Sequence, residues 1–263
     1  MRKIRQIAAA VMAGAMVAAA VTGCAGKQDP REVYDAAVAK NAALESMDVD
    51  ASMKIGLAQG EENMEVEVVT NIKVDQSDKE HLKYLTTAST TLQGQSMETT
   101  AFYTDGYYYM DAAGQKLKYP MDMEEMMKTI EDSVGTTEMT SDSMESIELK
   151  EDGENTILTF TADPEKMSDY LDEVMGSLGD LNALGDLNMT IDSASGEYTI
   201  NKDGYYTDMK VDMAITMEAA GSTLNMTIDM TGSYNNPGQA VEVTIPDTEG
   251  YTEIDPALMG AGQ

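Results

Sequence analysis

Residues 208–218 read Asp-Met-Lys-Val-Asp-Met-Ala-Ile-Thr-Met-Glu, and residues 224–231 read Leu-Asn-Met-Thr-Ile-Asp-Met-Thr. In both stretches apolar side chains occupy every second position, which is the period of a β-strand with one buried face. Gly221-Ser222 lies between the two stretches and suits a turn. Together they predict a long antiparallel hairpin that turns its apolar face toward the core.

The same period-two pattern recurs along most of the chain. Asp105-Gly106 and Asp152-Gly153 provide tight turns between neighbouring predicted strands. The alternation changes phase near residues 194–196, where we expect a β-bulge or break. Further strands are predicted over residues 53–57, 64–75, 81–92, 97–103, 107–110, 146–150, 156–161, 187–200 and 241–245.

Three helices are predicted between these strands. Asp29-Pro30 provides a cap and a suitable first helical residue for a helix that runs to about Met47. Apolar residues at helical spacing predict a second helix over residues 121–134, and Asp163-Pro164 begins a third that reaches about Leu178. The sum is an α+β protein with about ten antiparallel strands and about three helices, in one domain over residues 29–250.

The N-terminal segment has the form of an export signal. Positive charges within residues 2–5 precede an uncharged run, Ile7–Val21. That run is too short and too rich in Ala for a membrane span, which needs about 20 strongly apolar residues. The following Val21-Thr22-Gly23-Cys24 resembles the lipobox of bacterial lipoproteins. The resemblance implies a signal peptide over residues 1–23 and acylation of Cys24.

Charge and cysteine content support an anchored, extracytoplasmic protein. Cys24 is the only cysteine, so the chain cannot form an internal disulfide. The net charge of −30 argues against nucleic acid, which selects basic surfaces, and against docking on anionic lipid. We expect acylated Cys24 to hold the protein on the outer face of the cell membrane, with residues 24–28 as a tether and residues 251–263 as a flexible tail.

The order of these elements is similar to that of the LolA-like lipoprotein superfamily. The features in common are the lipobox, the capped first helix, the long meander, two middle helices, the final hairpins and the closing Val-Thr-Ile-Pro at residues 243–246. The similarity covers about residues 29–247 and includes LppX/LprG-type lipoproteins and Gram-positive surface lipoproteins of unassigned role. It implies one strongly curved antiparallel sheet, an open half-barrel, with helices packed on its concave face. In carrier members the space between sheet and helices holds acyl chains.

Carboxylates abound, so residue type alone leaves a two-carboxylate glycosidase open, whereas histidine, cysteine and tryptophan are scarce. His81 is the only histidine, and its place at the start of a predicted strand favours an exposed edge residue over a catalytic base. The chain has no Trp and only two Phe, whereas sugar-binding sites commonly stack the sugar on aromatic rings. The turn at residues 151–155 lacks the alternating ligands of a calcium loop. We expect no catalytic residue, metal or cofactor, and a protein that is not an enzyme.

Methionine is unusually frequent, with 23 residues. Its side chain is unbranched and soft, so it fills irregular or changing space. Three interpretations remain: an ordinary core built with Met in place of Leu and Ile, a deformable apolar cavity, and thioether capture of copper(I). Capture of copper(I) agrees least with the sequence. Copper sites need methionines clustered in accessible loops, whereas the methionines of this chain alternate inside predicted strands and helices.

We predict that the protein binds a hydrophobic or amphiphilic ligand between the sheet and the helices. The ligand would be a lipid or the acyl chains of another lipoprotein. The alternative is an interaction or sensor-accessory lipoprotein with a filled core, which would meet an envelope protein through its acidic surface or strand edges. The candidate lining residues are Met123, Met126, Met127, Met209, Met213, Met217, Leu224, Met226 and Met230.

Overall fold

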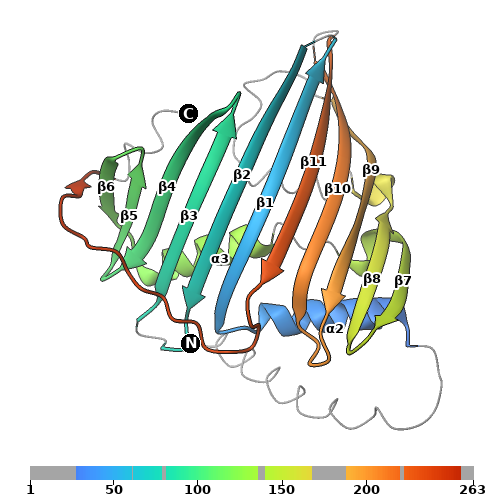
Figure 1. Ribbon diagram of the computed structural model, residues 1–263, viewed down its shortest axis with the longest axis horizontal. Coiled ribbons are helices and arrows are strands. Elements are labelled where there is room, and N and C mark those ends of the chain that lie inside the picture. Colours follow the sequence, from blue (N-terminus) through green and yellow to red (C-terminus); the bar gives the residue numbers. More distant parts are fainter. Residues whose placement is uncertain are drawn as a thin grey trace, which may run out of the picture.

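A computed structural model describes most of the chain between residues 28 and 255. Twelve strands form a single sheet in the order β12-β6-β5-β4-β3-β2-β1-β11-β10-β9-β8-β7, and the sheet is open and curved (Figure 1). Neighbouring strands run antiparallel, except that β12 pairs with β6 in parallel. The described ranges are 28–60, 62–78, 81–135, 140–167, 188–219 and 222–255.

Most of the strands are long, and β12 is the shortest with two residues. The first six are β1 (Ser46–Gln59), β2 (Glu62–Asp75), β3 (Lys83–Leu92), β4 (Gln95–Thr104), β5 (Tyr107–Ala112) and β6 (Gln115–Pro120). The others are β7 (Met144–Asp152), β8 (Asn155–Ala162), β9 (Asn188–Ile200), β10 (Tyr206–Ala219), β11 (Ser222–Tyr234) and β12 (Thr252–Glu253). Within the described ranges the helices include α2 (Pro30–Ala42), α3 (Met123–Gly135) and the short 3₁₀ turn η1 (Ser141–Ser143).

The predicted fold class is confirmed: one curved antiparallel sheet carries the helices on one face. The sheet has twelve strands where the sequence predicts about ten, because β6 and β12 escape prediction. Strand β6 follows a turn at Ala113-Gly114, where Ala113 adopts a φ of 51°. Alanine rarely takes this left-handed conformation, so the sequence does not signal the turn.

Two predicted details are wrong, and a third is slightly displaced. Helix α2 ends at Ala42 rather than near Met47, because Met47 pairs with Val74 in the sheet. Residues 241–245 form no strand; instead Val243 is buried while the segment passes beside the sheet. The predicted β-bulge is present in β9, at Asp192, just before the expected stretch 194–196. The third predicted helix begins at Pro164, and its part beyond Met167 lies outside the described residues.

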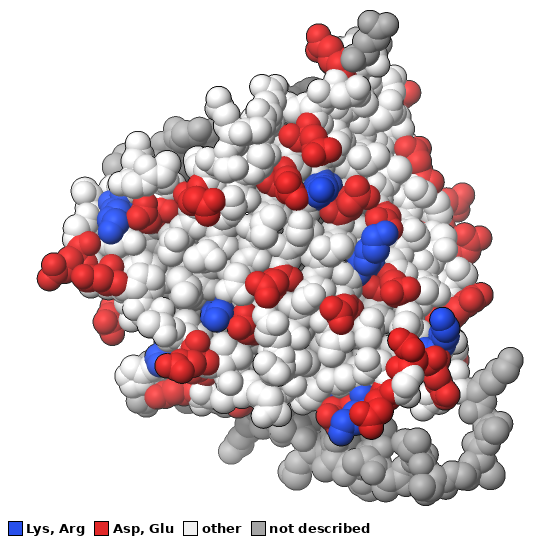
Figure 2. Space-filling view, viewed as in Figure 1, with Lys and Arg blue, Asp and Glu red and all other residues white. Residues whose placement is uncertain are grey.

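Strand register gives the sheet one apolar and one polar face. Met53 of β1 lies between Val68 and Met230, and Met230 in turn lies beside Val211, so apolar residues form continuous rows across four strands. We call the face that carries these rows the inner face. The opposite, outer face carries many Asp and Glu side chains and few Lys or Arg (Figure 2).

The two helices pack on separate parts of the inner face, behind the sheet in Figure 1. Helix α2 contributes Tyr34 and Ala37 to a cluster with residues of β7–β10, including Phe160 and Tyr198. Helix α3 contributes Met126 and Ile130 to a second cluster that lies on β2–β6. Within the described part of the chain, no helix has the length and apolar character needed to cross a membrane.

The segment after β11 runs across the outer face and ends beside β6 (Figure 1). Near its end, the Tyr251 ring packs edge-on against the rings of Phe102 and Tyr109, with centroid distances of 5.7 and 5.1 Å. Thr252 and Glu253 then pair with β6. Residues 251–255 are therefore packed on the sheet, whereas the sequence predicts a flexible tail from residue 251.

Candidate ligand pocket

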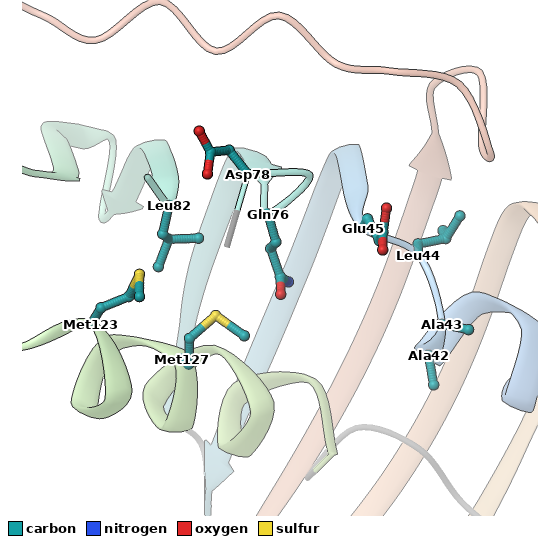
Figure 3. Close-up of a pocket in the computed structure, with 9 residues that line it drawn as sticks. All are labelled: Ala42, Ala43, Leu44, Glu45, Gln76, Asp78, Leu82, Met123 and Met127. Carbon is teal, nitrogen blue, oxygen red and sulfur yellow. The ribbon is translucent and has the colours of Figure 1, made fainter. Parts of the chain in front are cut away.

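A cavity of about 450 Å³ lies between the C-terminal end of α2 and the first turns of α3 (Figure 3). Three chain segments form it: the end of α2 with its connection to β1, the region from the end of β2 to the start of β3, and α3. Its lining residues are Ala42, Ala43, Leu44, Glu45, Gln76, Asp78, Leu82, Met123 and Met127.

Helical spacing decides which side chains of α3 reach this cavity. Asp122 caps the helix, since its Oδ1 accepts a hydrogen bond from the Glu125 backbone N–H at 2.8 Å. Met123 and Met127 lie four residues apart and therefore share one side of α3, which they present to the cavity. Met126 lies on another side and is only 1% exposed against the sheet.

Hydrogen bonds hold the two connecting segments together. The Gln76 backbone N–H donates to the Glu45 carbonyl at 2.7 Å, which joins the α2–β1 connection to the end of β2. Asp75 accepts hydrogen bonds from the Ser77 hydroxyl at 2.6 Å and from the Ser46 hydroxyl at 3.3 Å. The bond from Ser77 is the main reason why the pKa of Asp75 lies below its ordinary value. This wall of the cavity is thus built from fixed backbone.

The lining is apolar with an acidic margin. Six of its residues are Ala, Leu or Met, and the polar ones are Glu45, Gln76 and Asp78. Leu82 is buried, while Glu45 and Asp78 are exposed. The ring Nδ1 of His81 lies 2.9 Å from Asp78 Oδ2, and its side chain is 71% exposed, as the sequence predicts for an edge residue. Among the described residues, no three His, Cys, Asp or Glu side chains gather as metal ligands would.

A row of tyrosines extends the inner face next to α3. Tyr84, Tyr103, Tyr108 and Tyr119 are neighbours across β3–β6, and the rings of Tyr108 and Tyr119 lie 5.4 Å apart. Burial raises the pKa of the phenols, most strongly that of Tyr108. These rings are therefore neutral at ordinary pH and form an apolar surface.

Only some of the predicted lining residues contribute to this cavity. Met123 and Met127 line the cavity, and Met126 lies in the packed cluster between α3 and the sheet. The strand residues are half-buried on the inner face of β10 and β11 and lie outside this cavity's lining: Met209, Met213, Met217, Leu224, Met226 and Met230. Cys24 lies outside the described residues.

The sequence does not point to the remaining lining residues. The sequence predicts that the first helix continues to Met47, so it does not indicate that residues 42–45 form a connection that lines a cavity. Gln76, Asp78 and Leu82 belong to a connection between strands, where no period marks a residue as buried. The one available signal is Leu82 itself, an apolar residue among charged neighbours.

This protein is an α+β open half-barrel: an open, curved sheet carries helices on one face, and a cavity lies between α2 and α3. The chain belongs to the family described as "Family of unknown function (DUF6612)", whose profile matches residues 29–248. Among curated proteins, none matches the chain.

Several solved structures are similar to this one. LprF from Mycobacterium bovis matches with a TM-score of 0.41 and 10% identity, over 83% of this chain and 96% of LprF. The lipoprotein LppX of Mycobacterium tuberculosis has the same TM-score and identity, over 83% of this chain and 100% of LppX. The LolA superfamily protein NE2245 from Nitrosomonas europaea has a TM-score of 0.16 and 7% identity, over 76% and 92% of the two chains. At such scores no residue role or ligand is carried over from these proteins to this chain.

Proposed function

We propose that this protein binds a hydrophobic or amphiphilic molecule, such as a lipid or an acyl chain, in the cavity between α2 and α3. The observation that carries the proposal is a cavity of about 450 Å³ with a mainly apolar lining. Ligand pockets typically measure about 300–1,000 Å³ and are lined by apolar side chains with a few polar groups. Binding alone, without bond cleavage, is the activity that this lining supports.

The two methionines make the cavity adaptable. Met123 and Met127 approach it from α3, opposite the α2–β1 connection (Figure 3). Each has several rotatable bonds and a polarizable sulfur, so the lining can adjust to chains of different shape. The apolar rows of the inner face continue beside α3 and offer a path for a longer chain.

A direct test measures binding of an environment-sensitive apolar dye to the mature chain carrying Cys24→Ser. We expect stoichiometric binding and displacement of the dye by a fatty alcohol. The Met127→Trp variant fills the cavity and should weaken binding at least tenfold. Met97→Trp is the matched control, because Met97 is 50% exposed at the start of β4, and it should bind like the parent protein. Absence of binding by the parent protein would contradict the proposal.

We also propose that the protein is a lipoprotein anchored at Cys24 on the extracytoplasmic face of the membrane. The proposal rests on the signal-like segment before Cys24 and the lipobox-like residues 21–24. Cells that produce the full chain should retain it in the membrane fraction, and Cys24→Ser should release it into the soluble extracytoplasmic fraction. Equal release of both proteins would show that Cys24 carries no anchor.

A further inference from the structure

We propose that the cavity prefers an amphiphile with a positively charged headgroup, such as an alkylammonium. This inference rests on the proposed function and specifies its ligand. The apolar tail would contact Leu82, Met123 and Met127, and the ammonium group would lie at the margin beside Glu45 and Asp78.

Polarity is unevenly distributed within the lining. Leu82 is buried and the two methionines are half-buried, whereas Glu45 and Asp78 are exposed. The cavity is therefore apolar inside, and its opening carries the two acids together with the exposed Ala42 and Ala43; Gln76 lies between the two acids in the close-up (Figure 3). A molecule that completes both parts needs a tail that avoids water and a head that attracts carboxylates.

The lining carries no basic side chain of its own, since it contains no Lys, Arg or His. Within the described ranges, the Glu45 carboxylate has neither a hydrogen-bond donor nor an ion-pair partner. The Asp78 carboxylate lies 2.9 Å from the His81 ring and adds a second acidic group to the opening. Glu45 is therefore the acid best placed to meet a cationic head, and Asp78 strengthens the negative potential around it.

Among the described lysines close in sequence to the lining, Lys128 follows Met127 and is exposed on α3, and two others contact different parts of the chain. Lys83 follows Leu82, but it pairs in register with Asp75 on the outer face of the sheet. Lys40 of α2 donates to the Asp203 carbonyl and lies over the Tyr205 ring at 4.4 Å. The lining itself carries two carboxylates and no basic side chain, so it favours a cationic head over an anionic one, and the chain's net charge of −30 acts in the same direction.

The test compares three probes with the same decyl tail: decylammonium, decanol and decanoate. Their affinities for the mature Cys24→Ser chain are measured by calorimetry at neutral pH and low salt, below their critical micelle concentrations. We expect decylammonium to bind at least tenfold more tightly than decanoate, with decanol between them. Added salt should reduce the difference, because the acidic opening is exposed to solvent.

Two variants with the same change in net charge locate the effect. Glu45→Gln with Asp78→Asn should remove the preference and leave the affinity for decanol unchanged. Asp229→Asn with Glu218→Gln, on the outer face, should retain the preference. Equal binding of all three probes, or equal loss of preference in both variants, would overturn the inference while the proposed function stands. Failure of all three probes to bind would instead contradict the proposed function itself.

Discussion

Gly196 shows how one residue shapes the packing beneath α2. A Cβ atom at this position would lie 2.5 Å from the Lys210 carbonyl oxygen and 2.6 Å from the Phe160 ring. Without it, Phe160 lies close to the backbone of β9 and stacks on Tyr198 at 5.7 Å. Tyr198 in turn contacts Tyr34 of α2 at 5.6 Å. The position of α2 therefore depends on glycine, which has no side chain, at this position of β9.

We predict that Gly196→Ala destabilises the protein. The added methyl group must displace backbone or a buried ring, and overpacking of this kind costs about 1–3 kcal/mol. The free energy of unfolding in urea measures the effect. Gly56→Ala is the matched control in β1, because its Cβ would meet only the rotatable Thr227 side chain. Equal stability of the two variants would show that the ring has room to move.

The buried tyrosines predict a loss of stability at alkaline pH. Burial raises the pKa of Tyr84 and Tyr108 above the ordinary value of 10.0 in the folded protein. The phenols are neutral in both states below pH 10, so their contribution is fully present there. As pH rises past this ordinary value the unfolded chain ionises first, and stability falls until the folded-state pKa values are reached.

Circular dichroism against pH, together with tyrosinate absorbance, measures this transition. Tyr108→Phe removes one of the ionising groups and should shift the alkaline unfolding midpoint to higher pH. The same variant unfolded in urea at neutral pH serves as the control for any general change in stability. A midpoint that does not move would mean that Tyr108 does not drive the transition.

At the scale of elements, the C-terminal segment acts as a strap on the outer face. It passes over the ends of central strands and delivers Tyr251 to the Phe102–Tyr109 pair, whose rings are stacked at 4.6 Å (Figure 1). Lys116 also lies over the Tyr251 ring, at 5.3 Å. One ring thus connects the end of the domain to β4, β5 and β6.

We predict that Tyr251→Ala loosens this strap and destabilises the protein by roughly 1–3 kcal/mol, since each aromatic pair contributes about 0.5–1.5 kcal/mol beyond area burial. Urea unfolding gives the free energy, and hydrogen exchange of the β6 amides should become faster. Tyr251→Phe keeps the ring and should lose much less stability. If both variants behave like the parent protein, the strap does not stabilise the sheet.

At the scale of the whole molecule, charge is the dominant feature. The chain has 47 Asp and Glu residues against 17 Lys and Arg residues. Several ion pairs on the sheet are exposed, such as Lys54 with Glu67 at 3.5 Å and Lys210 with Asp212 at 2.9 Å. Such pairs contribute little, so most of the acidic charge is left to repel itself.

We therefore predict that salt stabilises this protein. Raising NaCl from about 0.01 M to about 0.15 M shortens the Debye length from about 30 Å to about 8 Å and screens the repulsion. A gain of about 1 kcal/mol would raise Tm by about 2–4 °C in a chain of this size. Calorimetric Tm values across the salt series test this. A constant or falling Tm would show that self-repulsion is not significant in the folded state.

The sequence alone determined most of the strands, their apolar and polar faces, and helix α3. These features follow from periods that repeat within one segment: alternation in residues 208–218 and helical spacing in residues 123–130. The turn at Asp105-Gly106 was also predictable from the sequence, because both positions adopt positive φ, which Asp and Gly tolerate. The same periods placed Met123 and Met127 on one side of α3, which the cavity then uses.

Only the tertiary structure decided where α2 ends, where the C-terminal segment lies and which residues share a cavity. The α2–β1 connection, the end of β2 and Met127 are far apart in sequence, and sheet register with helix docking brings them together. The apolar alternation at residues 241–245 indicated burial but could not distinguish a paired strand from a strap lying on a sheet. Local patterns report which side chains avoid water, whereas the neighbours that cover them are chosen by contacts between distant segments.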